Sequence, residues 1–205
     1  MRPALRTAAV LMLALLAAAC ATSRLTSTWV EPGRTPTPFK DLAVFGVAAN
    51  ETVRRVYEDS FVAALKARGV RARPGYSLLP EGDLGDVKTV KEAVALSGAD
   101  GVIVTYLAGQ NTETVYVPPR NYVTPSLYGG LYPYYGLVYD NVTEPGYYAR
   151  FKLLQLETNV YDLARQKLVW SGRSQTLDPS SEQTTINEVV ELVTASLAQA
   201  GFLPR

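Results

Sequence analysis

The first half of the chain alternates buried strands with amphipathic helices. Residues 42–47 are apolar at every position, as expected of a parallel strand that is covered on both faces. Asn50 is a preferred helix N-cap residue, and apolar side chains then recur at helical spacing up to Leu65. Gly69 suits the left-handed position at a helix end. The pattern therefore predicts a strand followed by a helix that packs on it.

Two arginines lie at the edge of this helical stripe. We expect Arg54 and Arg55 to point to solvent, because charged side chains rarely lie fully buried. Binding of an anionic partner by the pair is the alternative.

The same alternation is then repeated once. Residues 70–77 resemble a strand that Pro74 and Gly75 weaken, and a shorter helix is predicted after Asp86, which suits an N-cap. Residues 101–107 are apolar and β-branched, as in a strand. A strand–helix–strand–helix–strand order implies right-handed crossovers with helices packed on a sheet.

The second half of the chain changes to antiparallel signals. Residues 112–117 and 150–162 each alternate as strands, and residues 167–176 return after a turn. In the long strand the even positions from 154 to 160 share one face, but Phe151 and Leu153 have the opposite phase. We therefore expect a bulge near residues 153–154.

The chain closes with a helix, and an extra strand is predicted near its start. The apolar stripe Ile186, Val189, Val190, Val193 and Leu197 follows a capping segment, and Gly201 ends it. Residues 25–30, with Trp29, read as an edge strand. The predicted fold class is α/β (α+β): a mixed sheet of about five to seven strands, βαβαβ followed by an antiparallel hairpin and a C-terminal helix, with the helices packed on the sheet.

The start of the chain has the pattern of a secretory signal. A basic start is followed by residues 8–19, which are apolar and uncharged but too few for the ~20 residues that span a bilayer. Residues 17–20, Ala-Ala-Ala-Cys, resemble the lipobox of bacterial lipoproteins, although that family prefers Leu where Ala17 stands. The resemblance implies that Cys20 carries a diacylglycerol and becomes the acylated first residue after cleavage. A secreted protein with a chance cysteine is the alternative.

This anchor defines an expected location and domain plan. In the resembling family, a residue other than Asp after the cysteine, here Ala21, implies the outer membrane, facing the periplasm. Several acyl chains hold a protein firmly, since each buried methylene contributes about 0.8 kcal/mol. We expect a signal peptide at 1–19, a lipidated, proline-containing tether at 20–40 and one α/β domain at 41–205 with an insertion at 118–148.

Composition excludes several kinds of function. The full chain has a formal net charge of +1, and loss of Arg2 and Arg6 with the signal would change it to −1, so nucleic acid is not an expected partner. The chain has no histidine, and its one cysteine is the proposed anchor. Neither a Ser-His-Asp triad nor the usual zinc sites can be built. No phosphate-binding glycine motif occurs either, so we predict no cofactor, metal or catalytic residue.

The insertion at 118–148 gathers most of the aromatic side chains. It is also rich in Gly and Pro, from which we expect no regular helix. Three interpretations remain open: a cover for the sheet, a protein contact surface or a glycan contact surface. Nine of the 13 tyrosines lie there or at its edge: Tyr116, Tyr122, Tyr128, Tyr132, Tyr134, Tyr135, Tyr139, Tyr147 and Tyr148.

Three segments are similar to a group of bacterial envelope lipoproteins. Leu42–Val47 with Asn50 resembles the first strand and loop of the group, and Ala99–Val104 resembles its "G-A-D-x-hydrophobic" third strand. Val160–Ser171 resembles its hairpin, with Leu163–Gln166 in place of a Thr-Gly turn. The group comprises the curli-secretion lipoprotein, the penicillin-binding-protein activator lipoproteins and the N-terminal domain of TolB. The resemblance implies a non-enzymatic, protein-binding role without naming a partner.

Three functions follow from these patterns. The first is a membrane-tethered protein-interaction module in envelope assembly or maintenance. The second is binding of peptidoglycan, polysaccharide or a small ligand by the tyrosine-rich insertion. The third is a glycan hydrolase, which needs two carboxylates ~5–10 Å apart; Glu113, Asp140 and Glu144 are the candidates near the aromatics.

Overall fold

The protein folds around one mixed sheet. The structure, a computed structural model, describes residues 22–33, 35–79, 86–118, 131–143 and 146–204. Its strands are β1 (Ser23–Val30), β2 (Asp41–Val47), β3 (Arg71–Pro74), β4 (Gly101–Val117), β5 (Tyr147–Asp162) and β6 (Lys167–Leu177). Its helices are α2 (Glu51–Ala67), α3 (Val87–Ser97), α4 (Leu131–Thr143) and α5 (Glu182–Gln199), with a short 3-10 helix at Gly75–Ser77.

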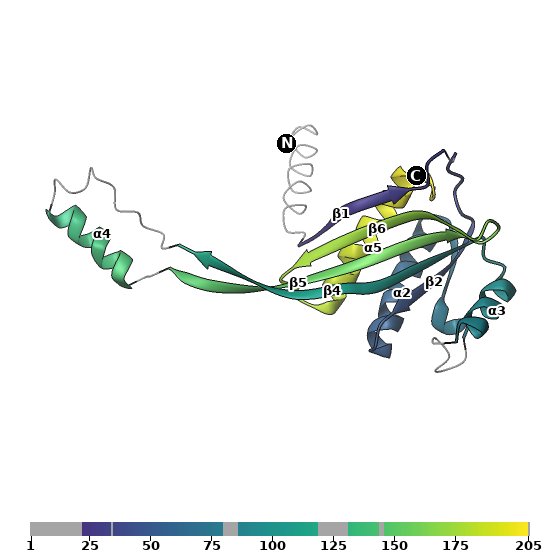
Figure 1. Cartoon of the computed structure of the whole chain (residues 1–205), viewed down its shortest axis with the longest axis horizontal. Helices are drawn as coiled ribbons and strands as arrows, with labels where there is room; N and C mark the ends of the chain where they lie inside the picture. Colours follow the sequence, from purple (N-terminus) through teal and green to yellow (C-terminus); the bar gives the residue numbers. More distant parts are fainter. Residues whose placement is uncertain (1–21, 34, 80–85, 119–130, 144–145, 205) are drawn as a thin grey trace, which may run out of the picture.

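The sheet has six strands in the order β1-β6-β5-β4-β2-β3. β2 is parallel to both β3 and β4, whereas β4, β5, β6 and β1 pair antiparallel in succession. The predicted α/β class, the mixed sheet and the edge strand near the start of the chain are confirmed. Figure 1 shows the strands in this order, with β1 at one edge.

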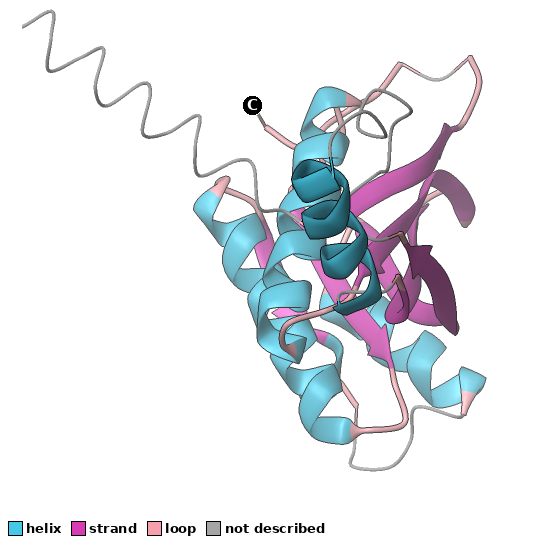
Figure 2. Cartoon of the chain, turned by 90° about the vertical axis from the view of Figure 1, so that its left-hand side faces the viewer, coloured by secondary structure: helices cyan, strands magenta, loops and turns pink. Residues whose placement is uncertain are grey.

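Helices lie on both faces of the sheet (Figure 2). α2 and α5 pack against each other and cover one face. The larger core lies there, between strand residues such as Ile103, Val160 and Trp170 and helix residues such as Phe61 and Val193. α3 covers the other face of β2 and β4, where Val94 packs with Phe45 and Val102. Burial of β2 on both faces confirms the interpretation of its continuous apolar run.

The helix ends follow the capping residues in the sequence. The Asn50 side chain accepts a hydrogen bond from the Val53 amide at 3.2 Å, and the Asp86 carboxylate accepts two from the first turn of α3. Gly69 and Gly98 take φ values of +78° and +70° just past the helix ends. These local signals therefore place α2 and α3 correctly.

Three strand predictions need correction. Residues 101–107 and 112–117 belong to one 17-residue strand, β4, and not to two. The predicted bulge at residues 153–154 of β5 is absent, since pairing there is continuous; the extra residue is Ala108 of β4. β3 ends at Pro74, and the 3-10 helix follows where a longer strand was expected.

Two further expectations were wrong. A helix, α4, forms within the insertion where none was expected, because Pro133 falls in its first turn and removes no helical hydrogen bond there. Arg54 is 7% exposed and does not lie on a solvated face, while Arg55 is half-buried beside Glu51. Within the described residues, no helix has both the length and the hydropathy needed to cross a bilayer.

Candidate functional site

β4 and β5 continue past the rest of the sheet as a two-stranded arm. We define the arm as residues 112–117 of β4 paired with residues 147–152 of β5. The pairing of β4 with β2 ends at Tyr106, and that of β6 with β5 begins only at Leu153. A rise of about 3.4 Å per residue makes the arm roughly 17 Å long. Figure 1 shows it projecting from one end of the sheet.

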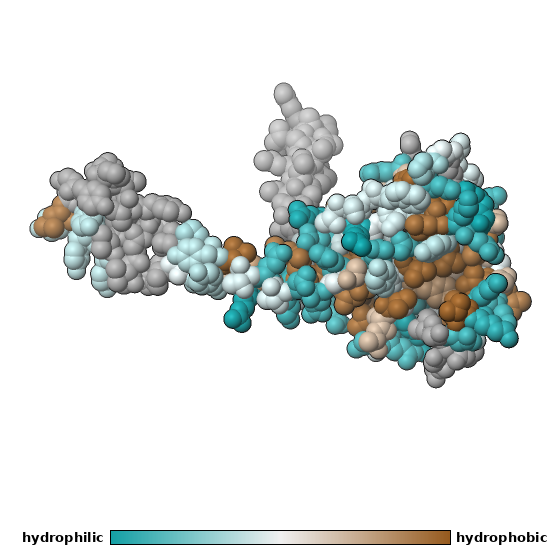
Figure 3. All heavy atoms as spheres, in the orientation of Figure 1, coloured by the Kyte–Doolittle hydropathy of each residue, from teal (hydrophilic) through white to brown (hydrophobic). Residues whose placement is uncertain are grey.

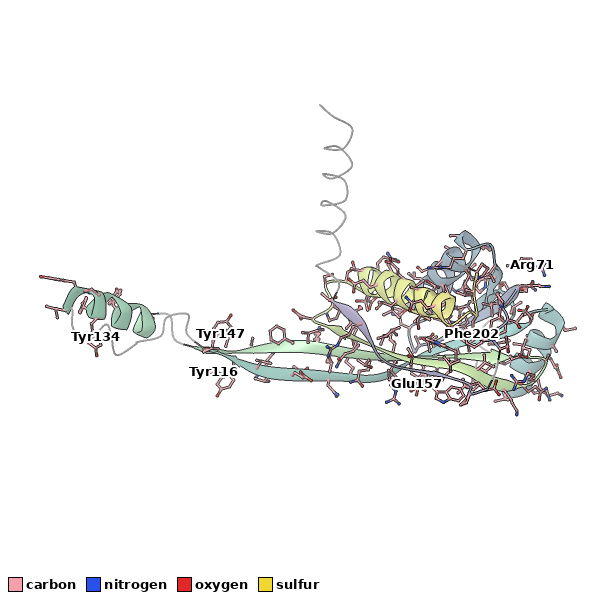
Figure 4. The ribbon with its side chains drawn as sticks, turned by 90° about the horizontal axis from the view of Figure 1, so that it is seen from above. Arg71, Tyr116, Tyr134, Tyr147, Glu157 and Phe202 are labelled. Atoms are coloured by element: carbon pink, nitrogen blue, oxygen red, sulfur yellow. The ribbon has the colours of Figure 1, made fainter. Side chains whose placement is uncertain are left out.

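The outer end of the arm carries exposed tyrosines. Tyr116 and Tyr148 form a cross-strand pair with ring centroids 5.2 Å apart, and Tyr148 is 74% exposed. Tyr147 points to the opposite side of the arm from Tyr116 (Figure 4). Gly146 leaves room for the Tyr116 ring, because a Cβ at that position would collide with the phenol. The arm therefore presents phenol rings on both of its faces.

α4 lies at the far end of the arm and is rich in exposed aromatic side chains (Figures 1 and 4). Tyr132 is 84% exposed, and Tyr135 and Tyr139 are also exposed. The last two are one helical turn apart and stack with centroids separated by 6.3 Å. Tyr134 is half-buried. α4 packs extensively against no other described element.

The tyrosines predicted as a contact surface thus fall into two described groups. Tyr116, Tyr147 and Tyr148 lie on the arm, and the four in α4 lie beyond it. Tyr122 and Tyr128, like Cys20, lie outside the described residues. The described part of the insertion projects away from the sheet and does not cover it (Figure 1).

The candidate carboxylates are less well defined. Glu113 is exposed on the arm, whereas the Asp140 side chain and Glu144 lie outside the described part of the chain. Their proposed pairing stays a prediction. Across the described residues, no group of three or more Asp, Glu, His or Cys side chains is arranged to hold a metal ion.

A buried glutamate that the sequence interpretation did not single out fixes the body near the arm. Glu58 of α2 is fully buried, and its two carboxylate oxygens accept hydrogen bonds from the amides of Gly46 at 3.0 Å and Tyr76 at 2.8 Å. Burial raises the pKa of the carboxyl group, and these amides oppose that shift. Glu58 therefore holds the end of β2 and the 3-10 helix against α2.

A second buried polar group joins α2 to the root of the arm. The Tyr57 hydroxyl donates to Thr105 Oγ1 at 2.8 Å, and Thr105 Oγ1 lies 2.9 Å from Thr158 Oγ1. Burial raises the pKa of Tyr57 and keeps its phenol neutral. The two threonines interrupt otherwise apolar faces of β4 and β5, which is the only sequence signal that marks them.

Comparison with known proteins gives a fold-level similarity only. No family model and no curated protein matches the chain. The structure is similar to the PelC dodecamer from Paraburkholderia phytofirmans, at 13% identity and a TM-score of 0.45, over 89% of this chain and 98% of the other. It is also similar to the lipoprotein GNA1162 from Neisseria meningitidis, at 13% identity and 0.42, over 78% and 98%. Both TM-scores are too low to carry an argument about function.

Proposed function

We propose that this chain is a non-enzymatic, lipid-anchored protein of the bacterial envelope that contacts another envelope protein through the arm and α4. The anchor is acylated Cys20 in the outer membrane, with the folded domain facing the periplasm. The lipobox-like residues 17–20 support this location. The lack of histidine, with the single cysteine assigned to the anchor, supports a role without nucleophilic catalysis.

The observation that carries the proposed contact is the exposure of tyrosines on an element held away from the core. Six of the described tyrosines on the arm and α4 are exposed: Tyr116, Tyr132, Tyr135, Tyr139, Tyr147 and Tyr148. Large apolar side chains on a monomer usually lie singly, and a cluster of them marks an interaction site. Tyrosine suits such a site because it buries a large ring at a small cost in side-chain entropy.

Photo-crosslinking in cells tests the contact. A photoreactive amino acid replaces Tyr132 or Tyr135 on α4, and Leu96 on α3 serves as the control position because it is also apolar and 88% exposed. We expect discrete protein adducts from the two α4 positions and background from Leu96. Equal adduct patterns from all three positions would contradict a contact surface on α4.

Glycan binding is the second candidate, and the stacked pair Tyr135–Tyr139 favours it because aromatic rings also suit sugar faces. Co-sedimentation of the protein with purified cell wall distinguishes the two functions. Wall binding that is lost in a Tyr135→Ser/Tyr139→Ser variant would favour the glycan. Absence of co-sedimentation at low salt, together with protein adducts from α4, would favour the protein partner.

A further inference from the structure

A cavity lies at the root of the arm and is separate from the tyrosine surface. It has a volume of about 440 Å³ and lies between the inner face of the sheet and the first turns of α2 and α5. Small-molecule sites usually have about 300–1,000 Å³. Most of its wall is apolar and is formed by Val47, Val53, Leu107, Leu154, Leu156 and Ile186.

The cavity exists because the strands continue beyond the helices that cover them. α2 begins at Glu51 and α5 at Glu182, and β4 and β5 run on past these ends into the arm. Leu107 and Val47 are consequently 48% and 55% exposed at the cavity mouth. Figure 3 shows, on the face that it presents, that apolar surface gathers on the body at this end of the arm as well as over the sheet. A hydrocarbon chain would therefore find an apolar surface along the two strands.

A buried arginine gives the cavity a cationic wall. The Arg54 stem packs over Gly46, where a Cβ would lie 3.5 Å from Arg54 Cγ. The side chain is only 8% exposed, and its salt bridge among the described residues joins Nη2 to Glu51 Oε1 at 3.5 Å. The same oxygen accepts hydrogen bonds from Arg55 at 2.6 and 2.9 Å. Since a guanidinium has five N–H donors, most of those on Arg54 are left for another acceptor.

The other charged groups near the cavity add to this preference. Lys152 of β5 contributes a second cation to the wall, and Glu182 is the acid that opposes it. The N-terminal ends of α2 and α5, capped by Asn50 and Ser181, both lie at the cavity, and helix N-termini favour anions. Nearby Glu58 is already engaged by two backbone amides. An anion fits this wall better than a cation does.

We propose that the cavity binds a single-chain anionic amphiphile, a long-chain fatty acid, with its carboxylate at Arg54 and its hydrocarbon chain along Leu107, Leu154 and Leu156. A carboxylate matches the guanidinium fork of arginine, which binds it through two parallel hydrogen bonds. The apolar wall matches the chain, since each buried methylene contributes about 0.8 kcal/mol.

The anchor proposed above would place this cavity near a source of such molecules. Thr22 Oγ1 donates to Glu188 Oε2 of α5 at 3.2 Å, and Ser23 N donates to the same oxygen at 3.0 Å. Cys20 precedes Thr22 by two residues, which span at most about 7 Å of extended chain. This step alone rests on the proposed lipidation; the cavity and its charges do not.

A photoreactive fatty acid tests the proposal on the full chain. The protein, purified from membranes, is placed in phosphatidylcholine nanodiscs with palmitic acid that carries a diazirine on its chain, and labelled peptides are mapped. We expect labelling of the peptides that contain Leu107 and residues 154–156. The methyl ester of the same probe should label them about tenfold less, because it lacks the anionic head. Equal labelling by acid and ester would overturn the proposal.

Two variants sharpen the test. Arg54→Met keeps a long stem over Gly46 but removes the charge, and should lower cavity labelling about tenfold. Arg24→Met is the control on exposed β1 and should label like the wild type. If Arg54→Met does not fold, the acid and ester comparison on the wild type decides alone. Cavity labelling that occurs only in a Cys20→Ala chain would identify the protein's own acyl group as the occupant and overturn the proposal.

Discussion

At the scale of single residues, Glu58 shows how a buried charge organises the body. Both of its oxygens accept backbone hydrogen bonds, so neither the end of β2 nor the 3-10 helix has another partner for those amides in the described structure. Burial holds the pKa of its carboxyl group above the ordinary value of 4.5. The folded state therefore binds this proton more tightly than the unfolded state does.

Glu58→Gln should reduce the free energy of unfolding by about 1–3 kcal/mol at neutral pH, because the amide nitrogen cannot accept one of the two hydrogen bonds. The stability that the raised pKa contributes is complete below pH 4.5 and is lost as the pH rises through the folded-state pKa. The difference between wild type and variant should therefore shrink as the pH rises. Urea unfolding at several pH values measures it, and a gap that widens with pH would contradict this account.

Gly172→Ala should destabilise the body because it crowds the largest buried side chain. A Cβ at Gly172 would lie 2.9 Å from Trp170 Cζ2, and Trp170 is fully buried in the main core. Overpacking of this kind usually costs about 1–3 kcal/mol. Gly136→Ala in α4 is the matched control, since its Cβ would point into open space. Thermal unfolding that lowers the melting temperature of both variants equally would exclude this explanation.

Residues that act on their own backbone neighbours were the easiest to predict. Asn50 and Asp86 were assigned as helix caps from local sequence, and both make the expected hydrogen bonds. Arg54 could not be placed in the same way. Its burial depends on the missing side chain of Gly46, which lies on a different element, and no pattern within α2 contains that information.

At the scale of elements, the sheet was predictable and the arm was not. Apolar runs identified the core strands because burial requires them. Residues 108–111 lack such a run, since they are largely exposed, and the bulge at Ala108 carries β4 through them. α4 was missed because the high Gly and Pro content of the whole insertion concealed a 13-residue segment in which Pro133 lies in the first turn.

Replacing residues 120–146 by a short glycine-containing turn should leave the global stability almost unchanged. α4 makes no extensive contact with another described element, so its removal exposes no core. We expect the free energy of unfolding to change by less than about 0.5 kcal/mol, as for most surface changes. Circular dichroism and thermal melting provide the measurement. Loss of the fold would mean that the insertion belongs to the core.

At the scale of the whole molecule, the start of β1 and the arm lie at the same end of the sheet. Ser23 pairs with Thr176, near the point where Leu177 pairs with Leu153 at the root of the arm. α3 lies at the opposite end (Figure 1). If Cys20 is acylated, the arm therefore leaves the body on its membrane-proximal side. A partner that binds α4 would then lie close to the membrane.

Energy transfer to labelled lipid headgroups tests this orientation. A dye is attached to Tyr135→Cys on α4 or to Leu96→Cys on α3, and the native cysteine does not compete because the acyl group blocks it. We expect the higher transfer efficiency from position 135, since α3 lies at the end of the sheet away from the anchor. Higher efficiency from position 96 would mean that the arm points away from the membrane.

The central claim is that acylated Cys20 holds this body at a membrane. Intact mass measurement of the protein extracted from bacterial membranes tests it most directly, with a Cys20→Ser variant as the control. The account predicts a chain that begins at Cys20 and carries a diacylglycerol thioether with an acylated amine, and a control that lacks this mass and is released from the membrane. An unmodified or uncleaved wild-type chain would contradict it.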